Sequence, residues 1–110
     1  MARIYIPLVR EDQVQPQFIV VDNCILERHR VDVIKFVAWD DNAVPTMTEW
    51  HLGKWCESER GDWCCNHGHN LVHLLSHKFS SNETLIAIHA YFPPKRWTEF
   101  CLKFLDNTSI

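Results

Sequence analysis

Short apolar runs separated by polar connections make up the first quarter of the chain, a pattern typical of β-strands. In residues 3–9, Ile4, Ile6 and Leu8 alternate with Tyr5, Pro7 and Val9. Pro7 has no backbone N–H to donate to a neighbouring strand, so we expect this strand at the edge of a sheet. Phe18–Val21 and residues 24–26 are also apolar, and the Asp-Asn dipeptide between them suits a tight turn. This pattern predicts a β-hairpin.

Later segments differ in how clearly their period can be recognised. Residues 31–39 and 85–92 carry apolar side chains at successive positions, which predicts strands buried on both faces, with Trp39 in the core. Residues 95–105 place their large apolar side chains on one stripe at helical spacing and predict a helix. Residues 48–56 fit neither period well, and we favour a strand over a helix there.

The segment at residues 70–79 predicts a second helix. At about 100° per residue, one side gathers the apolar residues Leu71, Val72, Leu75 and Phe79. His73 and His77, together with His69 just before the segment, fall on roughly the opposite side. These three imidazoles are therefore expected to face away from the core and to remain accessible.

Together these elements predict an α+β fold with a single domain over residues 1–110. A mainly antiparallel sheet of four to five strands would carry two helices packed on one face. The length of 110 residues and the hydrophobic content of 46% fit one folded domain.

Charge and cysteine usage narrow the function classes. The formal net charge of −3 offers no basic surface for nucleic acid, which disfavours DNA or RNA as the partner. No apolar run is long enough for a membrane helix, and the first residues do not resemble a signal peptide. The odd count of five cysteines excludes a disulfide framework that pairs every cysteine within the chain. We therefore expect a cytoplasmic protein that does not associate with a membrane.

Residues 55–77 concentrate cysteine and histidine, the side chains that Zn²⁺ prefers. Histidines four residues apart project side by side from a helix, and adjacent cysteines seldom reach one ion together. The least strained set of four zinc ligands is Cys56, Cys64, His69 and His73, although the C-x2-C spacing of zinc modules is absent. In the alternative, the histidines form a solvated helix face and the cysteines are small buried apolar residues.

The same region also suggests a surface that binds a partner. Trp50, Trp55 and Trp63 lie where no clear period places them in a core, and large aromatic side chains are common at the centres of protein interfaces. With His77, they would form a partner-binding surface whose affinity changes between about pH 5 and 8. Filling the core is the alternative role for these tryptophans.

The run WCCNHGHNLVHL at residues 63–74 resembles the Cys/His-rich zinc loop and the His/Asn motif of the ββα-metal (HNH-like) endonucleases. The resemblance is confined to this run, and the paired cysteine knuckles of that family are absent. It implies a histidine general base and an asparagine or second histidine at a catalytic metal, for which His67 and Asn70 are the nearest counterparts. The alternative function is therefore a metal-dependent nuclease or hydrolase.

Phosphate-binding glycine loops and the common hydrolase motifs do not occur in this sequence. We therefore expect a small non-enzymatic protein that binds and modulates another macromolecule, above all another protein. It would be an inhibitor or accessory factor of the kind that phages, mobile elements or toxin-immunity pairs encode, and a zinc ion would stabilise it.

Overall fold

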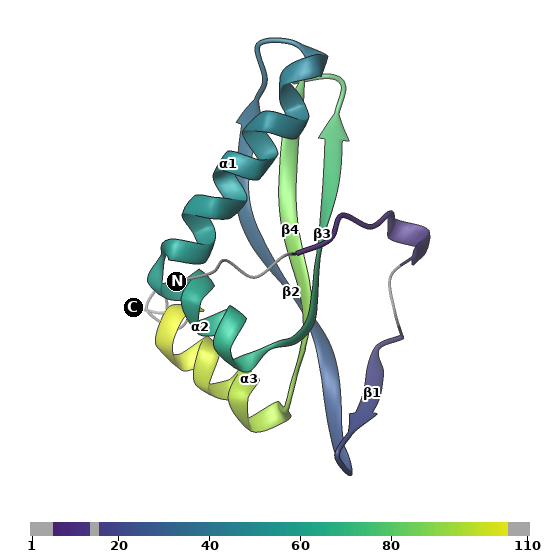
Figure 1. Cartoon of the computed structure of the whole chain (residues 1–110), viewed down its shortest axis with the longest axis vertical. Coiled ribbons are helices and arrows are strands. Elements are labelled where there is room, and N and C mark those ends of the chain that lie inside the picture. The colour runs from purple at the N-terminus through teal and green to yellow at the C-terminus, as the bar shows by residue number, and fades with distance from the viewer. Residues whose placement is uncertain (1–5, 14–15, 106–110) are drawn as a thin grey trace.

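An antiparallel sheet of four strands, in the order β1-β2-β4-β3, forms the centre of the protein. The computed structural model describes residues 6–13 and 16–105 and is shown in Figure 1. The strands are β1 (Phe18–Val21), β2 (Cys24–Val37), β3 (His69–Lys78) and β4 (Glu83–Phe92). The helices are α1 (Val44–Glu57), α2 (Glu59–His67) and α3 (Pro94–Phe100), which a π-helical turn at Cys101–Leu105 extends.

All three helices lie on the same side of the sheet in Figure 1, with α1 running obliquely along it and with α2 and α3 below the C-terminal end of α1. The predicted α+β fold with a mainly antiparallel sheet is therefore confirmed, with three helices where two were expected. No helix in the described ranges is long and apolar enough to cross a membrane.

The predicted hairpin at the start of the sheet is confirmed. Phe18–Val21 pairs with the first residues of β2, so that Val20 stands opposite Ile25. The turn residues Asp22 and Asn23 have φ angles of 51° and 65°, which are the left-handed values that a type I′ turn requires. Asp and Asn adopt this conformation more readily than most residues that carry a side chain. The turn sequence therefore favours the observed register.

The strand predicted at residues 85–92 is β4, the central strand of the sheet. It pairs with β2 along one edge and with β3 along the other. Ile86 and Ile88 belong to the core beneath the helices, and Ala87 and Tyr91 are buried on the opposite face. The apolar run predicted this element correctly because a strand buried on both faces needs no polar positions.

Residues 6–9 lie along β3, which is the edge strand on its side of the sheet. The N–H of Val9 donates to the carbonyl of His73 at 3.0 Å, and the N–H of His73 donates to the carbonyl of Pro7 at 2.9 Å. The sequence predicted an edge strand at residues 3–9, of which the first three lie outside the described part. The remainder forms a single parallel bridge at an edge position.

The helix predicted at residues 70–79 is wrong, because this segment is strand β3. Its closely spaced leucines fit a helical stripe and a doubly buried strand equally well. Pairing with β4 decides between them and turns Leu71 and His73 towards the core. The three histidines therefore do not share one solvated face, since His73 is buried while His69 and His77 are exposed.

The strand favoured for residues 48–56 is also wrong, because they form most of α1. Before the helix, the Asp40 carboxylate accepts a hydrogen bond of 3.0 Å from the backbone N–H three residues later, and Pro45 occupies the first helical turn. Ser58 then ends α1 and caps α2 by accepting from the N–H of Gly61 at 3.0 Å. These flanking residues mark the helix, whereas its apolar period is weak.

Two further expectations concern the ends of β2 and of the chain. β2 ends at Val37, so Trp39 lies beyond the strand and is 76% exposed, contrary to the prediction that it is in the core. The strand was also expected to be buried on both faces, yet Ile34 and Val37 are 40% and 56% exposed, and β1 covers its outer edge only over residues 24–27. The helix predicted at residues 95–105 is confirmed as α3 and its π-helical extension, and Trp97 is partly buried in it.

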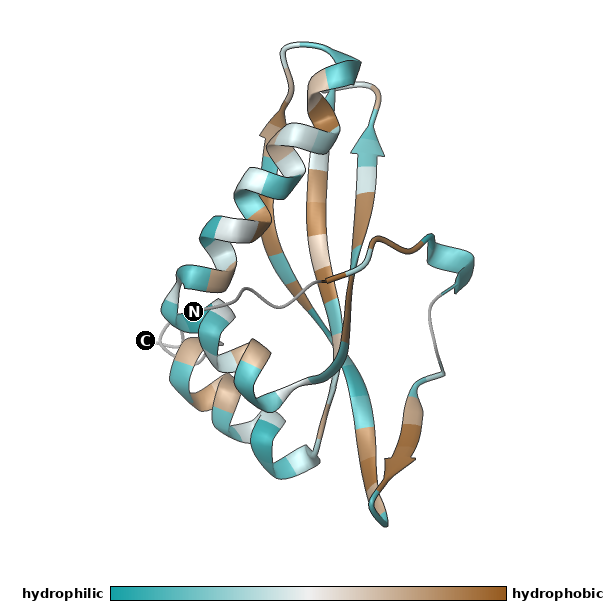
Figure 2. Ribbon diagram, in the orientation of Figure 1, coloured by the Kyte–Doolittle hydropathy of each residue, from teal (hydrophilic) through white to brown (hydrophobic). Residues whose placement is uncertain are grey.

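The core is divided into two clusters along the inner face of the sheet. The larger one lies where α2 and α3 cover the sheet, and aromatic side chains dominate it: Trp55, Trp63, Phe92, Trp97, Phe100 and Phe104. A smaller cluster around Phe36 and Ile86 lies under the start of α1. In Figure 2, the apolar residues accordingly line the strands, while much of the helical surface is polar.

Gly61 occupies a place in α2 where a side chain does not fit. A Cβ atom at this position would lie 1.7 Å from the carbonyl oxygen of Trp55. We expect Gly61→Ala to lower the free energy of unfolding by about 1–3 kcal/mol, since backbone must move to admit the methyl group. Urea unfolding measures the effect, and Asn66→Ala, at an exposed position of the same helix, is the control. Equal stability of the two variants would contradict this view of the α1–α2 junction.

Candidate functional site

The four residues predicted to bind zinc lie on three different elements. Cys56 is in α1, Cys64 in α2, and His69 and His73 in β3. Cys64 has no exposed surface and His73 is only 7% exposed, whereas His69 is exposed. Within residues 6–13 and 16–105, no group of three or more His, Cys, Asp and Glu side chains is arranged to hold a metal ion. Bound zinc therefore stays a prediction.

Two adjacent thiols of α2 face the neighbouring helix and the core. Burial raises the pKa of Cys64 to about 12, with a smaller contribution from Cys65. Burial likewise raises the pKa of Cys65 to about 12, followed by the charge of Cys56 and a hydrogen bond with its thiol. Both thiols are therefore protonated at neutral pH and neither acts as a thiolate nucleophile there.

His73 is fixed in the core by the backbone of the N-terminal segment. Its Nδ1 lies 2.9 Å from the carbonyl oxygen of Ile6. A carbonyl oxygen can only accept, so Nδ1 carries the hydrogen. Burial lowers the pKa of His73, which outweighs the opposite effect of the backbone hydrogen bonds. The ring is therefore neutral at pH 7, and its Nε2 is a hydrogen-bond acceptor.

The four residues predicted to bind a partner divide into two that are accessible and two that are not. Trp50 is 59% exposed on α1, and His77 is exposed near the end of β3. Trp55 is 7% exposed, and Trp63 is partly buried against Phe92 and other aromatic rings of the larger core cluster. In this structure Trp55 and Trp63 therefore have the core role, and the four residues do not form one surface.

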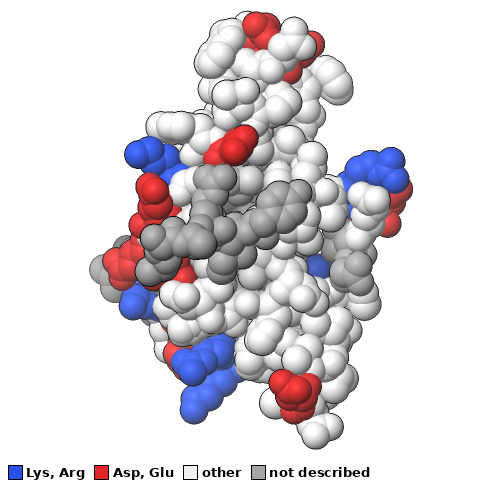
Figure 3. All heavy atoms as spheres, viewed as in Figure 1, with Lys and Arg blue, Asp and Glu red and all other residues white. Residues whose placement is uncertain are grey.

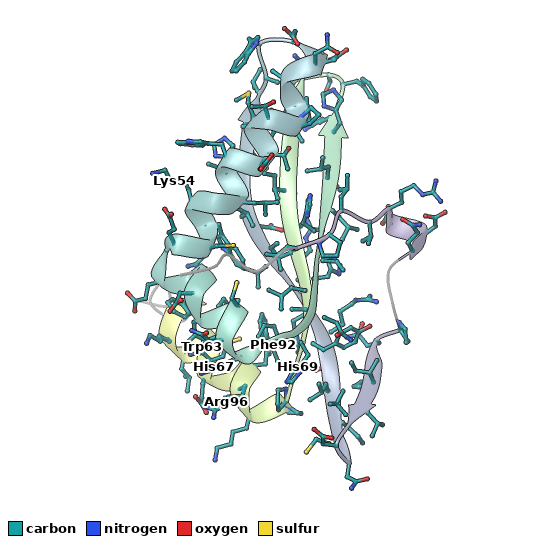
Figure 4. All side chains as sticks on the ribbon, in the orientation of Figure 1. Lys54, Trp63, His67, His69, Phe92 and Arg96 are labelled. Atoms are coloured by element: carbon teal, nitrogen blue, oxygen red, sulfur yellow. The ribbon has the colours of Figure 1, made fainter. Side chains whose placement is uncertain are left out.

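The two residues matched to the endonuclease motif lie on either side of the junction between α2 and β3. Figure 4 shows His67 near Trp63 and Arg96, where α2 and α3 lie side by side. The rings of His67 and Trp63 are 4.4 Å apart, and burial lowers the pKa of His67, followed by the charge of Arg96. Asn70 has a φ of 53° at the irregular start of β3. The nuclease alternative stays a prediction.

Charged side chains do not gather on the visible side of the molecule. In Figure 3, lysine and arginine occur in small separate groups among acidic residues and a large uncharged area. Ion pairs at the surface keep opposite charges together, as between Arg30 and Asp32 (2.7 Å) and between Arg96 and Glu99 (3.1 Å). On this face the distribution presents no continuous basic surface.

The sequence analysis missed an apolar surface on the β1–β2 hairpin. Phe18, Val20 and Ile25 are 57%, 68% and 61% exposed. Phe18 and Val20 lie two residues apart on one face of β1, and Ile25 stands opposite Val20 on the same face. We call these three side chains the hairpin surface. Figure 2 shows the apolar colour along β1 and the adjoining end of β2, below the helices.

A signal for this surface is present in the sequence. Residues 18–26 read FIVVDNCIL, and the only charged residue among them is Asp22 in the turn. A hairpin with one solvated face normally alternates apolar and polar residues. Here both faces are apolar, and only Leu26 is fully covered, at 2% exposure. The other face therefore remains in contact with solvent.

No protein family matches this chain, and neither does any curated protein or solved structure. The argument for function therefore depends on the geometry of the described residues.

The buried state of His73 predicts how stability depends on pH. The unfolded chain binds a proton at this position near pH 6.5, whereas the folded protein binds it only at lower pH. The stabilisation is therefore present above about pH 6.5 and is lost as the pH falls through the lowered pKa. We expect His73→Gln to reduce the loss of stability between pH 7.5 and pH 5.

Urea unfolding at these two pH values measures the difference. His69→Gln, at an exposed position of the same strand, is the control and should keep the pH dependence of the original protein. If His73→Gln also kept it, the imidazole of His73 would not be the titrating group.

Proposed function

We propose that this protein binds another protein through the hairpin surface and acts as a non-enzymatic inhibitor or accessory factor. The observation that carries the proposal is the exposure of Phe18, Val20 and Ile25 side by side on one face of the hairpin, at whose margin Glu27 stands opposite Phe18. Single exposed apolar residues are common, whereas contiguous groups mark interaction sites. Burying a side chain of this kind contributes about 1.5–3 kcal/mol, so the three together supply a substantial part of a binding free energy.

The edge of β1 supports the same proposal. Among the described strands, β1 pairs only with β2, which leaves the backbone groups of its other edge available. An extended segment of a partner can pair with such an edge while its side chains contact the apolar face. β1 carries no charged residue and no proline, which are the usual features that block strand addition. The partner would therefore contribute an extended segment with apolar side chains.

The state of the cysteines supports a reducing location. All five cysteines are free thiols, including the fully buried Cys64. Reduced thiols are the rule in the cytosol, whereas secreted proteins of this size usually form disulfides. A cytoplasmic protein whose partner is also cytoplasmic is consistent with this state.

The hairpin surface is tested by placing a charge at its centre. We expect Val20→Lys to weaken binding of the partner by at least about tenfold, because binding would bury an unpaired ammonium group. The partner is first isolated with the original protein from lysate of the source cells. The dissociation constant is then measured with both purified proteins.

Leu102→Lys is the matched control, since Leu102 is 65% exposed in the π-helical turn, on a different element. It should bind like the original protein, and both variants should keep their melting temperature. Equal affinities of the two variants would contradict the proposal. Sedimentation velocity over a range of concentrations distinguishes a foreign partner from a second copy of this chain.

A further inference from the structure

A cavity of about 360 Å³ lies between α1 and the inner face of β3, beside residues 6–8. Its β3 wall includes His73 and Leu75. Pro45 and Glu49 line it from α1 and are themselves exposed, so the cavity opens to solvent. Its volume falls within the range of pockets that bind small molecules, about 300–1,000 Å³.

The α1 wall explains why this space is not filled. Val44, Thr48, Leu52 and Cys56 follow one another at intervals of four residues and form one stripe of the helix. Three of these four side chains are short, whereas protein interiors are normally close-packed. α1 packs mainly on β2 and α2. On this stripe, which faces β3, Leu52 is the one longer side chain, so the gap is not closed.

One polar group in this wall has no partner. Thr48 is 4% exposed, and its Oγ1 forms no hydrogen bond with any part of the chain that the structure describes. A hydroxyl removed from water without a partner is unfavourable, and native structures generally satisfy such groups. A ligand in the cavity that hydrogen-bonds to Thr48 would satisfy it.

The opposite wall adds a second polar group of defined character. His73 is 7% exposed and uses its Nδ1–H for the carbonyl of Ile6, so its Nε2 can only accept. Thr48 Oγ1 can donate or accept. A ligand hydroxyl can therefore donate to His73 Nε2 and accept from the Thr48 hydroxyl.

The charges around the cavity restrict the ligand further. Among the described residues that line it, and histidine aside, Glu49 is the only acidic or basic one, and it is exposed. A charged ligand would therefore lose its hydration on entering the cavity and would find no buried partner of opposite charge there. Such a transfer is costly. We propose that this cavity binds a small, uncharged and largely apolar molecule whose hydroxyl group hydrogen-bonds with Thr48 and His73.

Three compounds with one hydrocarbon chain test the chemical class. 1-Octanol, octanoate and octylamine differ in the polar end, and the last two are charged at pH 7.5. Calorimetric and NMR titration of the full chain should show saturable binding of one octanol, with backbone amide shifts in α1 and β3. Octanoate and octylamine should bind at least about tenfold more weakly. Absence of saturable octanol binding, or equal binding of all three compounds, would overturn the proposal.

Variants of the lining locate the site. Thr48→Val keeps the shape but removes the hydroxyl, so octanol affinity should fall about tenfold, whereas Thr48→Ser should retain most of it. Thr46→Val, at an exposed position of the same helix outside the cavity, should bind like the original protein. Leu52→Phe should fill part of the space and abolish binding.

Melting temperature and circular dichroism establish that each variant is folded. Octanol binding that is unchanged in both Thr48→Val and Leu52→Phe would show that the ligand occupies another place. Because the hairpin surface and the cavity share no residue, loss of partner binding and loss of octanol binding are separate outcomes.

Discussion

Burial of β4 on both faces is the constraint on which the rest of the structure depends. The strand hydrogen-bonds to β2 and β3, so its backbone groups are satisfied from both edges. Ile86 and Ile88 need cover from the helices, and Ala87 and Tyr91 are covered on the opposite face. The Tyr91 hydroxyl donates to the carbonyl of Pro16, so the N-terminal connection contributes to that cover. This requirement explains why the helices lie on one face of the sheet and why the N-terminal connection contributes to the other.

The lengths and paths of the elements explain why the hairpin surface is exposed and why a cavity remains beside β3. A strand of 14 residues such as β2 extends about 45 Å, whereas a helix of 14 residues such as α1 extends about 21 Å. The helices therefore cannot cover the hairpin end of β2, and the hairpin surface stays in solvent. The oblique path of α1 has a second consequence, since it packs on β2 and leaves the cavity beside β3 (Figure 1).

The sequence predicted elements well where one local signal was decisive, and less well where two readings had similar support. The Asp-Asn turn, the doubly apolar run of β4 and the C-terminal aromatic stripe each fit one structure. The segment His69–Lys78 fits either period, and the choice of a helix placed His69, His73 and His77 on one solvated face. In the strand, the side chain of His73 points towards the core and donates a hydrogen bond to the carbonyl oxygen of Ile6. The helical spacing that selected His69 and His73 as zinc ligands therefore does not apply to this segment.

By itself, the sequence determined the fold class, the hairpin and its turn, and the concentration of apolar residues at the hairpin, because these depend on local conformational preference and on composition. The tertiary structure alone decided that His69–Lys78 is a strand, that Trp55 and Trp63 are in the core, and that Thr48 and His73 line one cavity. These facts depend on which segments pair and on how much area each helix can cover. Pairing partners and packing distances are properties of the whole folded chain, so no local pattern contains them.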